Sequence, residues 1–196
     1  NQNFILDTVS GVETLIPGAY DPVFIPGTEL MVLPRVEWNL DGIGFRIYSL
    51  EQLLNTNRNT PQLLDILELG GSYQSAGVLS KSVDQKYVIR IISEQQDQLH
   101  KLIDLSYDAK TMQVSALGQA YRFCPSFKLK LPMLSKDGKL LGALDLDTKT
   151  SAIFQINTDY SCTKIVDLGV KTGKINFNYD NTKITYHIYN KSVVQG

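Results

Sequence analysis

Short apolar runs that end in glycine recur along the chain at a nearly constant spacing. The glycines are Gly18, Gly70, Gly118 and Gly169, which lie 52, 48 and 51 residues apart. After each glycine the sequence predicts an inner pair and then an outer pair of short strands, joined by polar turns. A period of about 50 residues with four strands per unit is typical of β-propeller blades and not of helical solenoids. The repeat therefore predicts an all-β fold built from antiparallel blades.

The two ends of the chain complement each other within this repeat. The C-terminal segment ends after a predicted inner hairpin, 175–189, and the N-terminal segment starts with a predicted outer hairpin, 4–16. We expect these hairpins to share one blade, which closes a single-domain propeller with the four units 19–70, 71–118, 119–169 and 170–196 plus 1–18. Closure removes exposed sheet edges, which are a liability in β proteins. The alternative is a fragment of a longer propeller.

The clearest hairpin lies between Leu131 and Asp145, where two apolar runs flank the turn Ser-Lys-Asp-Gly-Lys. Asp-Gly between two such runs is the strongest short-range hairpin signal, because the turn needs a residue that accepts a positive φ. We interpret this stretch as the inner hairpin of one blade.

The residues from Leu131 to Phe154 also carry a resemblance to a known family. The pattern Pro-x-x-Ser-x-Asp-Gly-Lys, followed by an apolar strand and an Ile-Phe strand, resembles the repeat of TolB-like (WD40-like) propellers. Degenerate copies lie at 20–27 and 177–184, and the second unit has Ser82-Val83-Asp84 where the glycine turn is expected. The resemblance implies an exported bacterial protein, periplasmic or extracellular, that binds other macromolecules through its blade loops.

Composition narrows the classes of partner. Apolar residues make up 43% of the chain and charged residues 20%, which is ordinary for a globular protein. The formal net charge of −1 gives no electrostatic case for nucleic acid or an anionic membrane. The sequence contains no run of about 18 apolar residues and therefore predicts no membrane-spanning helix. We expect a monomer that binds a protein or a small polar ligand and uses no cofactor. The chain begins Asn-Gln-Asn-Phe, without methionine, so we expect a mature form or a fragment.

The two cysteines, Cys124 and Cys162, do not have the spacing of a metal site, and the two histidines are distant in sequence. Either the cysteines form one disulfide or they are two buried thiols. We expect His100, beside Lys101 at the start of a strand, to be exposed.

Candidate ligand contacts gather at the starts of the predicted inner strands. Because inner strands line the axis of a propeller, Asp21, Tyr73, Lys130 and Lys174 are expected to ring one mouth of the central channel. His187 lies on the second strand of the last hairpin, where strand alternation places it opposite the face of its two isoleucine neighbours. It is either a ligand contact or a hydrogen-bonded packing residue.

Catalytic motifs are absent from the sequence: it contains no Gly-x-Ser-x-Gly and no phosphate-binding Gly-x-x-x-x-Gly-Lys. Asp137, Asp145 and Asp147 fall within 11 positions and could do acid–base work or bind Ca²⁺, but turn and strand-end roles also explain them. Two interpretations also remain open for the aromatic residues Tyr20, Trp38, Phe45 and Tyr48: they form a contact patch for a ligand, or they pack in the core.

These patterns favour a non-catalytic binding scaffold of a bacterial envelope, which recognises a protein or polar ligand at one channel mouth. The alternatives are a hydrolase or lyase that uses mouth carboxylates with His187, and a fragment of a larger propeller protein that serves as a scaffold.

Overall fold

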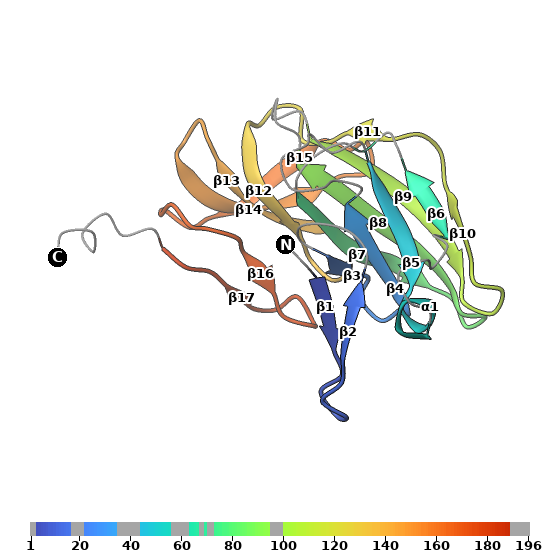
Figure 1. The fold of residues 1–196 in the computed structure, drawn as a ribbon. Helices are drawn as coiled ribbons and strands as arrows, with labels where there is room; N and C mark the ends of the chain where they lie inside the picture. The colour runs from blue at the N-terminus through green and yellow to red at the C-terminus, as the bar shows by residue number, and fades with distance from the viewer. Residues whose placement is uncertain are drawn as a thin grey trace.

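The computed structural model describes residues 3–16, 22–34, 44–55, 63–66, 69, 73–94 and 100–188. Within these residues the chain is all-β apart from the short helix α1 (Leu50–Asn55), and its strands pair antiparallel throughout (Figure 1). The expected fold class is therefore confirmed at the level of an all-β protein with several antiparallel sheets.

Three sheets of four consecutive strands make up most of the molecule. The first sheet contains β3 (Val23–Phe24), β4 (Leu30–Pro34), β5 (Phe45–Ser49) and β6 (Leu64–Ile66). The second contains β7 (Tyr73–Lys81), β8 (Lys86–Glu94), β9 (Lys101–Asp108) and β10 (Gln113–Ala116), with β11 (Tyr121–Arg122) added to the edge of β9. The third contains β12 (Leu129–Leu134), β13 (Leu140–Asp145), β14 (Thr150–Ile156) and β15 (Cys162–Asp167).

Two hairpins lie at the ends of the chain. They are β1 (Asn3–Leu6) with β2 (Glu13–Ile16), and β16 (Asn176–Phe177) with β17 (Ile184–Thr185). Each forms a separate two-stranded sheet among the described residues, so the structure does not show the expected closed ring.

Apolar clusters fill the spaces between successive sheets. The largest joins Leu30, Val32, Phe45 and Ile47 of the first sheet to residues such as Ile89 of the second. A second cluster lies between the second and third sheets, and smaller ones join β1–β2 to the first sheet and β16–β17 to the third. Each fully buried isoleucine or leucine contributes about 1.5–3 kcal/mol.

The strand β4 shows how its sequence serves this arrangement. Leu30 and Val32 face the second sheet, whereas Met31 and Leu33 face the β1–β2 hairpin and α1. Successive residues of a strand point to opposite faces, so a strand buried on both faces needs an uninterrupted apolar run.

The first strands of successive units lie side by side: β3 next to β7, β7 next to β12, and β12 next to β16. The contacts also fix their direction. The Leu134 N–H donates to Ser75 Oγ over 2.8 Å, and the Val78 N–H donates to the Lys136 carbonyl over 2.8 Å. Residue numbers increase in the same direction along both strands at this boundary, so β7 and β12 run parallel. The hairpin turns of both units therefore lie towards the same end.

Candidate functional site

The turn between β12 and β13 has the chemistry that its sequence predicts. The Gly138 N–H donates to the Ser135 carbonyl over 2.9 Å, and Gly138 adopts a φ of +68°. Asp137 Oδ1 accepts hydrogen bonds from Ser135 Oγ at 2.6 Å and from the Lys139 N–H at 3.2 Å. Asp137 is therefore a turn residue, in agreement with the structural interpretation of this carboxylate.

The same turn recurs in the second and fourth units. In the second, the Gln85 N–H donates to the Ser82 carbonyl and Gln85 has a φ of +62°. In the fourth, the Asn181 N–H donates to the Asn178 carbonyl and Asn181 has a φ of +59°. Asn tolerates the left-handed conformation better than most side chains. The three turns, 82–85, 135–138 and 178–181, are together called the turn end below.

Direct contacts bring parts of the turn end together. Asn181 Oδ1 accepts a hydrogen bond from the Lys136 N–H over 2.9 Å, which joins the third and fourth turns. The pKa of Lys81, at the end of β7, is raised above its usual value, mainly by its hydrogen bond to Tyr87 and with a smaller contribution from Tyr179. The third and fourth turns are therefore in direct contact through the hydrogen bond to Asn181.

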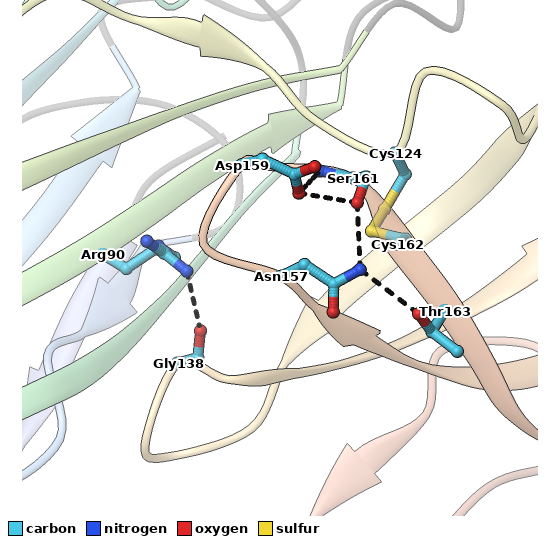
Figure 2. Close-up of a disulfide and its surroundings, with 8 residues drawn as sticks. All are labelled: Arg90, Cys124, Gly138, Asn157, Asp159, Ser161, Cys162 and Thr163. Atoms are coloured by element: carbon cyan, nitrogen blue, oxygen red, sulfur yellow. Dashed lines mark hydrogen bonds between the residues drawn. A yellow bond between two sulfur atoms is a disulfide. The ribbon is translucent and has the colours of Figure 1, made fainter.

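A partly buried ion pair lies beneath the third turn. Arg90 on β8 donates from Nε and Nη2 to the two carboxylate oxygens of Asp104, each over 2.8 Å. Its third nitrogen, Nη1, reaches the Gly138 carbonyl over 3.5 Å (Figure 2). The second sheet thus supports the turn of the third, and the fork geometry of arginine suits this two-sided contact.

The turn end carries more exposed positive than negative charge. Its turns and the strand ends beside them present five exposed lysines: Lys81, Lys86, Lys136, Lys139 and Lys183. Asp137 and Asp180 accept hydrogen bonds within their own turns, and Asp84 lies 3.7 Å from Lys110. The pKa of Asp180 is lowered by hydrogen bonds from the Thr182 hydroxyl and N–H, which keeps this carboxylate ionised.

The predicted ligand residues within the described part of the chain lie towards the opposite end of the inner strands, called the start end below. Asp21 and the side chain of Tyr73 lie outside the described part of the chain, although the Tyr73 backbone begins β7. Lys130 is exposed on β12, and Lys174 is half-buried just before β16. Their joint role as a ligand site stays a prediction.

His187 is exposed, three residues after the start of β17. Its ring occupies the space where Gly173 would carry a Cβ, and the Gly173 N–H donates to the His187 carbonyl over 3.0 Å. This places His187 beside the segment that contains Lys174. Packing over glycine accounts for the position of the ring, and its role as a ligand contact stays a prediction.

The other two carboxylates near the opening hairpin have charged partners. Asp145 is 2% exposed and accepts a hydrogen bond from Lys164 Nζ over 2.7 Å, whereas Asp147 lies 3.5 Å from Lys128 Nζ. Burial raises the pKa of Asp145, but hydrogen bonds from Lys164 and the Asp147 N–H outweigh burial, and the net pKa is lowered. The hydrogen bond to Asp145 raises the pKa of Lys164.

The structure joins Cys124 and Cys162 in a disulfide, with a Cα–Cα distance of 4.7 Å (Figure 2). Cys162 begins β15, and the turn before it is held by Asn157 Nδ2, which donates to Ser161 Oγ and Thr163 Oγ1. Cys124 lies in the segment 119–128, which pairs with the second sheet through β11 before it enters the third. This segment is called the strap.

Contacts with the strap and the start of β12 bury His100. His100 was expected to be exposed, but it is buried, with an exposed fraction of 3%. Its Nε2 lies 2.7 Å from the Leu129 carbonyl oxygen. The Phe123 N–H donates to the His100 carbonyl, and the Phe123 ring lies beside the imidazole. The burial of His100 therefore depends on residues more than twenty positions away in the sequence. The prediction of an exposed residue relied on the neighbouring Lys101, which carries no information about those distant contacts.

The proposed aromatic patch is also not assembled as a unit. Phe45 packs between the first and second sheets, whereas Tyr48 packs on the other face of β5 against α1. Tyr20 and Trp38 lie outside the described residues.

Sequence reasoning missed the turn-end residues Val83 and Tyr179, which are fully exposed and 86% exposed, respectively. The signal that could have found them is the pattern Ser/Asn-x-Asp followed by a left-handed residue. Val83, Lys136 and Tyr179 occupy the same position x in their three turns.

Two kinds of feature are absent from the described residues. No group of three His, Cys, Asp or Glu side chains in that part of the chain is arranged to hold a metal ion. No helix found there is long and apolar enough to cross a membrane.

No family model matches the sequence, and no curated protein matches it significantly. Among solved structures, a chain in the complex of KlAtg21 with the coiled-coil of AgAtg16 superposes on 95% of this chain, with a TM-score of 0.51 and 12% identity. Atg21 has a WD40-like, propeller-type structure, and the likeness concerns the fold. This chain spans about half of that neighbour, 56% of its length. A protein from Lactobacillus plantarum aligns with 97% of this chain and 85% of its own length at 11% identity, with a TM-score of 0.29.

Proposed function

We propose that this chain is a non-catalytic binding scaffold with a propeller arrangement of its sheets, and that it recognises a protein or a polar ligand at one end of its inner strands. The observation that carries the proposal is the hydrogen bond between the Lys136 N–H and Asn181 Oδ1, together with the one between the Val78 N–H and the Lys136 carbonyl. Because of these contacts, residues of three successive units are joined to one another at the turn end. Rigid scaffolds that present several loops together are well suited to binding.

The proposed ring contains a fourth blade shared by β16–β17 and β1–β2. An isolated two-stranded hairpin is marginally stable in water, and each of these hairpins already packs one face against a complete sheet. Side-by-side inner strands and the likeness to a WD40-like structure support this arrangement.

The proposed location is a bacterial envelope, either the periplasm or the extracellular side. The TolB-like pattern around Asp137 and Gly138 supports this location, and a disulfide between Cys124 and Cys162 is typical of oxidising compartments. The KlAtg21 structure was solved with a protein coiled coil, which supports a protein as the partner of a fold of this kind.

A capture experiment tests the binding function and identifies the end that binds. The purified chain is the bait in an envelope extract, next to K130E at the start end and K136E at the turn end; both side chains are exposed. We expect a partner that is retained by the wild type and lost with one variant but kept by the other. Capture no stronger than that of an unrelated bait, or capture unchanged by both variants, would contradict the proposal.

A further inference from the structure

We propose that the turn end is a docking surface for an extended acidic segment of a partner protein, an inference that rests on the proposed binding function. The surface consists of the tip residues Val83, Lys136 and Tyr179 with the neighbouring lysines Lys81, Lys139 and Lys183.

The tips carry apolar groups that the fold does not use. Val83 is fully exposed and the Tyr179 side chain is 86% exposed, although both stand in turns where polar residues are usual. The third tip, Lys136, is tied to Val78 and Asn181 by its backbone, so its side chain is left to solvent. Tyrosine is enriched among residues that dominate binding energy, because it offers a large contact area and a hydroxyl on a side chain with few rotatable bonds.

The exposed charges of this surface favour an acidic partner. Lys136, Lys139 and Lys183 are exposed, and the nearby carboxylates Asp137 and Asp180 accept hydrogen bonds from their own turns. Lysine pairs with carboxylates, and such charges steer encounter and exclude basic partners. The chain as a whole has a net charge of −1, which favours an acidic protein segment over nucleic acid.

The backbone of this surface is held in place before any partner arrives. A Cβ on Gly77 would meet the backbone of Gly138, so β7 and the third turn approach each other too closely for any side chain at that position. The Arg90–Asp104 pair supports the same turn from below. A surface that is already ordered loses less conformational freedom on binding.

Fluorescence anisotropy tests the proposal with three labelled probes: the peptide (Glu-Glu-Leu)4, the peptide (Lys-Lys-Leu)4 and a twelve-nucleotide thymidine strand. We expect the acidic peptide to bind, the basic peptide not to bind, and the affinity to fall as salt is raised. K136E and Y179A should each weaken binding at least tenfold. K149E, on the exposed turn after β13 at the other end of the third sheet, is the matched control and should bind like the wild type.

Circular dichroism confirms that each variant is folded, and all three altered side chains are exposed or at turn tips. Equal binding of the acidic peptide by wild type and K136E, preference for the basic peptide, or binding of the thymidine strand that K136E abolishes would each overturn the proposal. Failure here remains distinct from failure of the binding function. If K130E abolishes capture from the extract and K136E does not, the scaffold function stands and the turn-end proposal falls.

Discussion

Single residues in the left-handed region set the geometry of the turn end, and Gly138 is the glycine among them. Its φ is +68°, and a Cβ there would lie 3.1 Å from Leu79 Cδ2. Gly169 has nearly the same φ, +65°, with nothing within 4 Å. We expect Gly138→Ala to lower the free energy of unfolding by more than the roughly 1–2 kcal/mol of the conformational cost alone. Gly169→Ala should show only that cost in urea denaturation, and equal losses would contradict this account.

A second residue-scale prediction concerns the pair Asp145–Lys164. The folded-state pKa of Asp145 is lowered, so its contribution to stability is present above the unfolded value of about 3.9 and is lost as the pH falls through the folded pKa. The pKa of Lys164 is raised, so its contribution is full below about 10.4 and is lost as the pH rises through its folded pKa.

We expect Asp145→Asn to lower the free energy of unfolding at pH 7 by about 2–3 kcal/mol, less than for a fully buried pair, because the Lys164 side chain is 23% exposed. The variant should also lose less stability than the wild type between pH 5 and pH 2, measured by urea denaturation at each pH. Asp147→Asn, at an exposed pair, is the control and should change stability little. Parallel pH profiles for wild type and Asp145→Asn would show that the pair does not contribute as argued.

At the scale of elements, the strap fastens the second sheet to the third. It pairs with β9 through β11, places Phe127 edge-on against Phe154, and is bonded to β15 through Cys124 and Cys162. We expect the double variant Cys124→Ser, Cys162→Ser to lose about 2–4 kcal/mol, because the bond closes a long loop in the unfolded chain. Urea denaturation of the wild type with reductant should reproduce the loss, and the double variant should be insensitive to reductant. If reductant leaves the wild type unchanged, the bond does not contribute.

The hairpin turns show why some features of the elements follow from the sequence and others do not. The β12–β13 hairpin was predictable, because the turn residues Asp137 and Gly138 lie next to each other and carry their own hydrogen bonds. In the second unit the left-handed position is held by Gln85, so the local signal is weak although the turn is the same. The burial of His100 and the hydrogen bond from the Lys136 N–H to Asn181 Oδ1 arise from contacts between units. No local sequence pattern encodes these contacts. The sequence therefore indicated a ligand site at the start end and gave no signal for the turn end.

At the scale of the whole molecule, the order of contacts is a stack: β1–β2, the three four-stranded sheets, and β16–β17, each packed on the next. In the arrangement proposed above, the two hairpins at the ends are the halves of one blade. The apolar side chains Phe4 and Leu6 on β1 and Tyr186 beyond β17 are exposed in the structure. Joining the halves would pair two strand edges that have no partner strand among the described residues, and unpaired edges are templates for aggregation.

Amide hydrogen exchange tests this closure residue by residue. The Asp7 N–H donates to the Val12 carbonyl, so by alternation along β1 the Ile5 N–H points towards β2, whereas those of Phe4 and Leu6 point to the free edge. The Asn178 N–H likewise donates to the Lys183 carbonyl, which directs the Ile184 N–H away from β16.

In a closed ring the Phe4, Leu6 and Ile184 amides exchange as slowly as the Ile5 amide, because β1 pairs with β17. In an open stack they exchange at the rate of solvent-exposed amides while Ile5 stays protected, and that result would contradict the shared blade. Protection that disappears on dilution would instead show that the strand edge is covered by a second copy of the chain. The exchange pattern of four amides, followed at two protein concentrations, therefore separates the closed ring from both alternatives.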